Sequence, residues 1–361
     1  MTTSVAAAPN ETARAEPHRR LQGKTVLWLG AALVLISLVT ASAQGAYAIA
    51  PLDILKTLWA ALFGGLDGSP EQLVFMNIRL PRLLLGVAAG AGLGLSGALM
   101  QGIFRNPLAD PGLIGVSSGA ALAAAATIVL GSSYFPELPR TIGSWPLVLM
   151  AFAGGMAVTL LIYMLSQSEG GTRISLMLLA GIAINALAGA GLGYLNFLAT
   201  DEQLRNIQFW LLGSLGGGRW SAVLLVFSIV FVAITAGLFC ARPLNAIALG
   251  EAQAALLGVD VERIKRRIVL VTAMAVGAIT ATTGIIGFVG LLAPHCIRLV
   301  AGPDHRIVLP GSAMLGAALV LLADAVARTI VQPAELPLGV LTAFVGVPFF
   351  LLLLRQFKGR V

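Results

Sequence analysis

The sequence predicts an all-α membrane protein whose chain crosses the bilayer many times. Of its 361 residues, 58% are hydrophobic and only 11% are charged, whereas soluble domains carry about 25% charged residues. The mean hydropathy is +0.91. Apolar runs recur along the whole chain, and one helical crossing of a bilayer needs about 20 such residues. We therefore expect one polytopic bundle without a second domain.

Ten apolar runs support this fold class. The first run, 25–43, could be a signal sequence, but no clear A-x-A cleavage site follows it, so we interpret it as a retained helix. The run 285–300 is short and contains Pro294, which predicts a broken or tilted helix. We expect about ten transmembrane helices in a single transmembrane domain, 24–361. The other eight runs lie at 83–104, 112–131, 146–165, 174–199, 221–240, 264–283, 307–329 and 338–354.

The distribution of basic residues predicts the topology. Residues 1–23 are polar and lack an apolar core, which predicts a disordered cytoplasmic tail. With this tail inside, 16 of the 23 Lys and Arg residues are cytoplasmic, as the positive-inside rule requires. Both termini are then cytoplasmic. The net charge of +7 is thus interpreted as a topology signal, and no nucleic-acid partner is expected.

Ionisable residues are nearly absent from the middle of the apolar runs. Asp324 comes closest, and Arg328 follows four residues later, so we expect a local salt bridge on one helix face. A proton site at Asp324 is the alternative. An ion-coupled secondary transporter needs a carboxylate or histidine relay at mid-depth. That class is therefore disfavoured.

No metal, nucleotide or catalytic site is expected in this chain. The three histidines, His18, His295 and His305, are not spaced with a carboxylate or cysteine as a metal ligand set. The GKT triplet at 23–25 lacks the glycine that opens a phosphate-binding loop five residues earlier. We expect a transport protein without a bound cofactor.

Residues 79–119 combine a paired-arginine entry, a glycine-rich apolar helix and a polar elbow, as expected for a solute pathway. Pro107 and Pro111 stiffen the elbow, and the Asn106 side chain can satisfy backbone groups that are freed there. The helix carries small residues at spacings that let helix backbones approach closely in lipid. These are Gly86, Gly90, Gly94 and Gly97.

Two polar segments further along the chain are expected to form surface helices. The segment 200–220 mixes charges with Phe209 and Trp210, which is typical of a helix on the outer rim. The loop 242–267 contains ALGEAQAALLG, closed by Gly258. Its small alanines suit a groove in a protein partner, with lipid anchoring as the alternative. We expect this docking helix to span about 244–258.

Six motifs occur in order between 79 and 350, and they carry a family resemblance that runs from about Leu52 to the C-terminus. They are RLPR at 79–82, RNPLADPGLIGVSSG at 105–119, ALGEAQAALLGV at 248–259, GIIGFVGLLAPHCIRL at 284–299, PDHR at 303–306 and ADAVARTIVQPAELPLGVLTAFVGVPFF at 323–350. With these motifs the chain resembles the permease subunits of ATP-binding-cassette importers for iron siderophores, haem and vitamin B12.

The resemblance implies a fold like that of the vitamin B12 importer permease in the bacterial inner membrane. It implies a homodimer with a central path, two cytoplasmic ATPase subunits that bind ATP and Mg²⁺, and a periplasmic binding protein. Two related helix sets, helices two to five and seven to ten, should have opposite orientation. Haem is the expected substrate, since RNPLADPGLIGVSSGAAL and GVDVERIKRR are most similar to haem permeases. A ferric siderophore or vitamin B12 is the alternative.

The resemblance also implies roles for three groups of residues. Guanidinium groups at the outer mouth should pair with glutamates of the binding protein, with interfacial anchoring as the alternative; these are Arg79, Arg82 and Arg328. The inner gate, for which an ordinary helix-ending turn is the alternative, should comprise Asn106, Leu108 and Ser175. The helix that couples the chain to the ATPase should present Gly250, Glu251, Ala254, Leu257 and Gly258.

Overall fold

The computed structural model describes residues 21–45, 49–65, 67–134, 143–331 and 334–357, which are almost entirely helical. This confirms the predicted fold class. Most of the predicted tail, 1–23, lies outside the described residues, and the first helix begins at Gly23. Six helices are long and apolar enough to cross a membrane by length and composition.

Within the described residues, one helix corresponds to each of the ten predicted apolar runs. Three shorter apolar helices match further runs, and the helix that matches the run 264–283, which begins in a charged segment, is the tenth. The ten are α1 (Gly23–Ala43), α4 (Leu80–Phe104), α5 (Val116–Ala126), α8 (Trp145–Leu165), α9 (Ile174–Leu198), α11 (Trp220–Leu238), α14 (Val261–Thr283), α15 (Val289–Ala301), α16 (His305–Ala327) and α17 (Leu338–Phe357).

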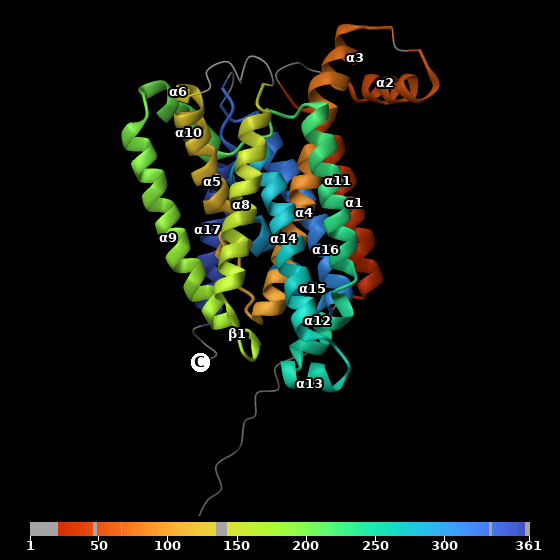
Figure 1. The fold of residues 1–361 in the computed structure, drawn as a ribbon. Coiled ribbons are helices and arrows are strands. Elements are labelled where there is room, and N and C mark those ends of the chain that lie inside the picture. The colour runs from red at the N-terminus through yellow and green to blue at the C-terminus, as the bar shows by residue number, and fades with distance from the viewer. Residues whose placement is uncertain (1–20, 46–48, 66, 135–142, 332–333, 358–361) are drawn as a thin grey trace, which may run out of the picture.

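The remaining elements are short and lie mainly toward the two ends of the bundle (Figure 1). Toward one end lie α2 (Pro51–Phe63), α3 (Pro70–Val74), the π-helical turn η1 (Phe75–Arg79), η3 (Thr127–Gly131), α6 (Ser132–Tyr134) and α10 (Asp201–Leu212). Toward the other lie the 3₁₀ turn η2 (Pro111–Ile114), α12 (Ala241–Ala248), α13 (Glu251–Leu256) and an antiparallel hairpin of β1 (Gln167–Ser168) and β2 (Gly171–Thr172). The predicted surface helix in 200–220 is therefore present as α10.

Contacts between helices define the two ends. At one end the Arg328 guanidinium, just after α16, donates to Ala41 O at 3.0 Å and to Gln44 O at 2.9 Å, at the end of α1. At the other end Leu21 N donates to Val300 O in α15 at 3.1 Å. We call these the arginine end and the α13 end. Helix α1 begins and α17 ends at the α13 end (Figure 1), as an even number of crossings requires.

Close backbone contacts surround α4, which is the centre of the bundle. In the most apolar 18 residues of the continuous helix 70–104, which includes α4, 89% are buried. A Cβ atom on Gly94 or Gly97 would collide with the carbonyl oxygen of Ser312 in α16 or of Gly290 in α15. The predicted small-residue packing is thus confirmed, because only glycine permits this approach.

The two predicted helix sets enter the bundle from opposite ends. Helix α4 begins at the arginine end and α14 at the α13 end (Figure 1). An irregular elbow follows each of them, at 105–110 and at 284–288. Arg105 (φ 48°) and Phe288 (φ 65°), the two non-glycine residues with positive φ in the described chain, lie in these elbows. The second elbow leaves α15 with only 13 residues, so this crossing is short as predicted, but the helix continues through Pro294 and is not broken there.

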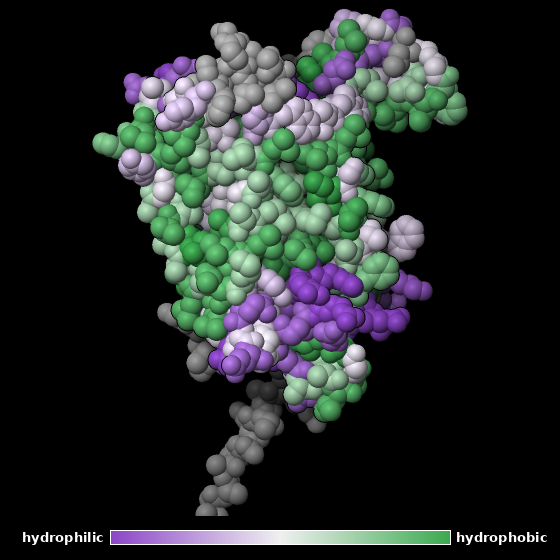
Figure 2. Space-filling view, in the orientation of Figure 1, coloured by the Kyte–Doolittle hydropathy of each residue, from purple (hydrophilic) through white to green (hydrophobic). Residues whose placement is uncertain are grey.

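The surface is divided into a broad hydrophobic belt and two more polar ends (Figure 2). At the α13 end, a polar band is followed by an apolar tip (Figure 2). Three exposed leucines of α13 and its flanking residues form what we call the leucine tip: Leu249, Leu256 and Leu257, which are 68%, 88% and 65% exposed. An apolar surface beyond a polar band lies outside the belt, and it therefore fits a protein partner better than lipid.

Candidate functional site

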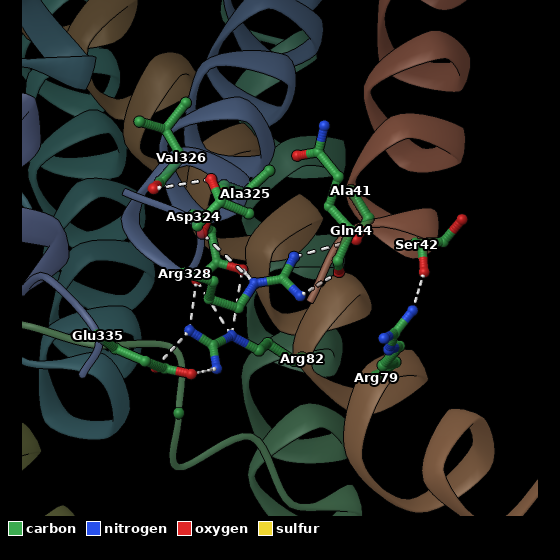
Figure 3. Close-up of polar contacts among 12 residues, drawn as sticks. Ala41, Ser42, Gln44, Arg79, Arg82, Asp324, Ala325, Val326, Arg328 and Glu335 are labelled. Atoms are coloured by element: carbon green, nitrogen blue, oxygen red, sulfur yellow. Dashed lines mark hydrogen bonds and ion pairs between the residues drawn. The ribbon is translucent and has the colours of Figure 1, made fainter. Parts of the chain in front are cut away.

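The three arginines predicted at the outer mouth meet at the arginine end (Figure 3). Arg79 ends η1 and Arg82 lies in the first turn of α4, so both side chains extend from one short stretch of helix. Arg328 follows the last turn of α16. Gly45 lies between two of them, since a Cβ there would be 2.9 Å from Arg79 Nη2 and 3.4 Å from Arg328 Nη1.

Two carboxylates hold Arg82 and Arg328 in place. Arg82 donates to Asp324 through Nε at 3.1 Å and Nη2 at 2.8 Å, and to Glu335 through Nη1 at 2.9 Å and Nη2 at 2.8 Å. Arg328 Nε lies 3.0 Å from Asp324 Oδ2, which confirms the predicted salt bridge four residues apart. We call Arg79, Arg82, Asp324, Arg328 and Glu335 the arginine cluster.

The arginine cluster is largely buried except at Glu335, and 11% of the Arg82 side chain is exposed. Only 4% of the Asp324 side chain is exposed, against 45% for Glu335. The hydrogen bond from Arg82 keeps the pKa of the Glu335 carboxyl below its usual value, although partial burial opposes this shift. Three positive charges against two negative ones leave the cluster with a net charge of +1. The member of the cluster that a partner would meet first is therefore the Glu335 carboxylate, and the guanidinium groups are largely covered.

The arginine side chains point inward more than the docking prediction assumed. Arg79 is 5% and Arg328 9% exposed, and both donate to backbone carbonyls at the end of α1, Arg79 to Ser42 O. The docking role stays a prediction. Sequence analysis missed Glu335, although its position between two apolar runs near Arg328 was a usable signal.

The elbow after α4 has the construction predicted from its prolines and Asn106. The side-chain oxygen of Asn106 accepts a hydrogen bond from Leu108 N at 2.9 Å. Asp110 caps η2 by accepting from Gly112 N at 2.7 Å. Asn106 is exposed and Leu108 half-buried. The elbow is therefore a fixed turn whose side chains line the surface at the α13 end.

Helix α9 runs beside this elbow. Asn185 Nδ2 donates to Gly112 O at 3.3 Å, and a Cβ on Gly181 would collide with Leu113 O. Ser175, in the first turn of α9, is exposed. The elbow and α9 are thus neighbours, while the gate formed by Asn106, Leu108 and Ser175 stays a prediction.

The predicted docking helix, about 244–258, is not one helix. It is divided between α12, which ends at Ala248, and α13, which begins at Glu251. Gly250 has φ 123°, a backbone conformation open to glycine that breaks the helix there. Gly258, with φ 80°, ends the segment where the sequence predicted.

The side chains of α13 divide between the chain itself and the outside. Ala254 is fully buried, and the Glu251 carboxylate accepts from Lys265 Nζ at 2.7 Å. Leu257, in the leucine tip, points outward. Glu251 therefore binds within the chain, and sequence analysis missed Lys265, its partner in α14. A lysine three residues after Glu262 near the start of an apolar run was the available signal.

The described residues thus form a multi-pass helical bundle around a glycine-rich central helix, with an apolar tip beyond the hydrophobic belt. The chain belongs to the FecCD transport family, whose sequence model matches residues 32–356. It is thus a permease subunit of an ATP-binding-cassette importer and not an enzyme, and the ATPase is a separate subunit.

Relatives with different named substrates are similar to this chain. The hemin transport system permease protein HmuU of Yersinia pestis is 43% identical over 80% of this chain and 85% of its own. The cobalamin import system permease protein BtuC of Halobacterium salinarum is 43% identical over 81% and 77%. A solved metal-chelate type ABC transporter in an inward-facing conformation has a TM-score of 0.80 at 30% identity, covering 92% of this chain and 99% of that one.

Proposed function

We propose that this chain imports haem across a bacterial inner membrane as a homodimer. The observation that supports haem is the similarity to the hemin permease HmuU over 80% of the chain. A corrinoid is the second candidate, because the cobalamin permease of Halobacterium salinarum has the same sequence identity to this chain, 43%, as the hemin permease. A ferric siderophore belongs to the same class of cargo, since the solved neighbour is a metal-chelate transporter.

The two ends of the bundle suit two different partners. The leucine tip is apolar and lies beyond the polar band, so it fits a groove in a cytoplasmic ATPase subunit. The arginine cluster carries a net positive charge at the opposite end, so it fits acidic groups of a periplasmic binding protein. ATP and Mg²⁺ then bind to the ATPase, and both termini of this chain are cytoplasmic.

Transport follows from these contacts without covalent chemistry in this chain. The loaded binding protein docks at the arginine end, and ATP closes the two ATPase subunits. That movement reaches the permease through α13 and opens the path between the two copies of the chain. The elbow and the first turn of α9 form the gate at the α13 end.

Uptake into liposomes tests the class and the cargo together. The vesicles hold this chain with its ATPase, and the binding protein is supplied with haem, a ferric siderophore and cobalamin in competition. We expect haem to accumulate only with ATP. Accumulation of another chelate would replace the cargo, and uptake without ATP would contradict the importer mechanism.

Docking of the ATPase is tested separately by copurification. Replacing Leu256 and Leu257 with glutamate places charges on the leucine tip, and we expect the ATPase to be lost from the purified complex. Arg263→Glu is the control, because Arg263 is also exposed and lies in the next helix. Retention of the ATPase by the leucine variant would contradict the assignment.

A further inference from the structure

Lys265 is a buried charge at the α13 end, only 2% exposed, at the junction of three elements. Its Nζ atom donates to Glu251 Oε2 in α13 at 2.7 Å, to Glu262 Oε1 in its own helix at 3.1 Å and to Thr172 O in β2 at 2.9 Å. A lysine ammonium has three N–H donors. All three are used, one for each partner.

Glu262 completes the same junction from the other side. Its Oε2 atom accepts from Thr172 N at 2.8 Å and from Thr172 Oγ1 at 2.6 Å. A Cβ on Gly171 would lie 2.7 Å from the Glu262 carboxyl, so glycine at that position lets the hairpin approach α14. The Thr172 carbonyl thus accepts from Lys265, and the Thr172 backbone N–H and hydroxyl both donate to Glu262.

Thr172 lies two residues before α9, which begins at Ile174. The junction therefore joins α13, through Glu251 and Lys265, to the start of α9, through Thr172. Lys265 and Thr172 are buried at the centre of this network, whereas 39% of the Glu251 side chain and 41% of the Glu262 side chain are exposed. Breaking the bonds of Lys265 would leave a desolvated charge, so the lysine holds its three partners in one arrangement. We call Glu251, Lys265, Glu262 and Thr172 the lysine junction.

We propose that Lys265 is a positioning residue that carries movement of α13 to α9. The proposal rests on the proposed role of α13 as the element that contacts the ATPase. In this proposal, Glu251 joins α13 to the rest of the chain through Lys265, and Lys265 reaches the start of α9 through Thr172. The leucine tip contacts the ATPase. Displacement of α13 then moves the first turn of α9 together with it.

A matched control lies on the same helix. Arg263 pairs with Asp260 at 3.1 Å with the same three-residue spacing as Lys265 and Glu262. The Arg263 side chain is 66% exposed, however, against 3% for Lys265. Exposed pairs of this kind contribute little to rigidity or stability. Lys265→Met and Arg263→Met are therefore comparable changes with different expected outcomes.

Spin-label distances test the junction directly. Labels at Ala255→Cys in α13 and Leu176→Cys in α9 are placed on a chain whose Cys240 and Cys296 are replaced by alanine. Without the ATPase, we expect a narrow distance distribution that Lys265→Met broadens and Arg263→Met leaves unchanged. With the ATPase, adding ATP should preserve the distance in the parent chain and change it in Lys265→Met.

Transport provides the functional readout. We expect Lys265→Met to keep the ATPase bound and hydrolysing ATP, while substrate imported per ATP falls by about 5- to 150-fold, the usual range of coupling between two sites. Lys265→Arg should recover part of that loss, because it keeps the charge. If Lys265→Met misfolds, Glu251→Gln weakens the lysine junction at its contact between Glu251 and Lys265. It should also broaden the distance distribution.

Two results would overturn the proposal. One is a distance distribution in Lys265→Met, or in Glu251→Gln if the first variant misfolds, as narrow as in the parent chain. The other is unchanged import per ATP. Failure of the ATPase to bind the parent chain would instead contradict the proposed function, and the measurement without ATPase would still decide whether Lys265 joins α13 to α9.

Discussion

At Gly97 the backbone of α4 lies directly against Gly290 of α15, and no side chain fits between them. We expect Gly97→Ala to destabilise the bundle by about 1–3 kcal/mol, the usual cost of overpacking a close contact. Gly193→Ala is the control, because a Cβ there meets nothing within 4 Å. Thermal unfolding in detergent measures both. Equal Tm values would contradict the close approach.

The contact between Glu335 and Arg82 should make the stability of the fold depend on pH. The pKa of Glu335 lies below the ordinary value because Arg82 donates hydrogen bonds to it. The folded pKa is thus lower than the unfolded one, so the contact stabilises the fold above the unfolded pKa and is lost as the pH falls through the folded value. The contribution is of order 0.2–1 kcal/mol, because the side chain is 45% exposed.

The measurement compares the parent chain with Glu335→Gln. At about pH 7 we expect the variant to have a slightly lower Tm, and the difference should disappear as the pH falls through the folded pKa of Glu335. Glu169→Gln, at an exposed position in the turn between β1 and β2, is a control for general charge effects. A difference that grows toward low pH would have the wrong sign for this contact.

Local sequence spacing was a good guide to single residues, but not to contacts between distant ones. The Asp324–Arg328 pair and the Asn106 turn involve residues within four positions of each other, and both were predicted. Lys265 and Thr172 are 93 positions apart. Their contact depends on how the hairpin packs on α14, which no local pattern contains.

At the scale of elements, α2 is an amphipathic helix projecting from the bundle at the arginine end (Figure 1). Its exposed apolar side chains recur at helical spacing. The side of α2 that is turned toward the hydrophobic belt is apolar (Figure 2). The exposed apolar residues are Leu52, Leu55, Trp59, Leu62 and Phe63. A helix of this kind lies in the membrane interface with its apolar face in lipid.

Spin labels on the two faces of α2 test this orientation. A label at Leu62→Cys should be accessible to oxygen and shielded from a water-soluble nickel complex. Lys56→Cys, on the polar face beside Asp53, should show the reverse. Equal access of the nickel complex to both positions would contradict burial in lipid, and shielding of Leu62 only after the binding protein is added would indicate a protein partner.

The break between α12 and α13 shows where prediction at the element scale fails. The alanine-rich stretch around Gly250 has high helix propensity apart from that glycine, so a continuous helix was expected. Burial of Ala254 and the bond from Glu251 to Lys265 hold α13 against α14. Tertiary contacts therefore select the break, and glycine permits it.

At the scale of the whole molecule, the positions of the ten apolar helices were predictable because bilayer thickness fixes the length of each apolar run. The apolar runs do not indicate which helices pack against each other. The central position of α4 follows from carbonyl contacts at Gly94 and Gly97, and a list of glycines cannot say which helix each one faces. The arginine cluster likewise required α1, α4 and α16 to meet at one end.

The same arrangement predicts which surfaces face each side of the membrane. Glu202, in the first turn of α10, is exposed toward the arginine end, and Leu256 is exposed at the α13 end. In a chain without its native cysteines, we expect a membrane-impermeant maleimide to label Glu202→Cys from the periplasm. Leu256→Cys should be labelled only after the membrane is opened.

The positive-inside rule and the bundle geometry make this a strict test. Because α1 begins and α17 ends at the α13 end, labelling of Leu256→Cys from the periplasm would place both termini outside and most basic residues with them. The leucine tip would then be unable to reach an ATPase, and the arginine cluster would be unable to reach a periplasmic binding protein. Labelling of Glu202→Cys alone places each surface on the side where its proposed partner is found.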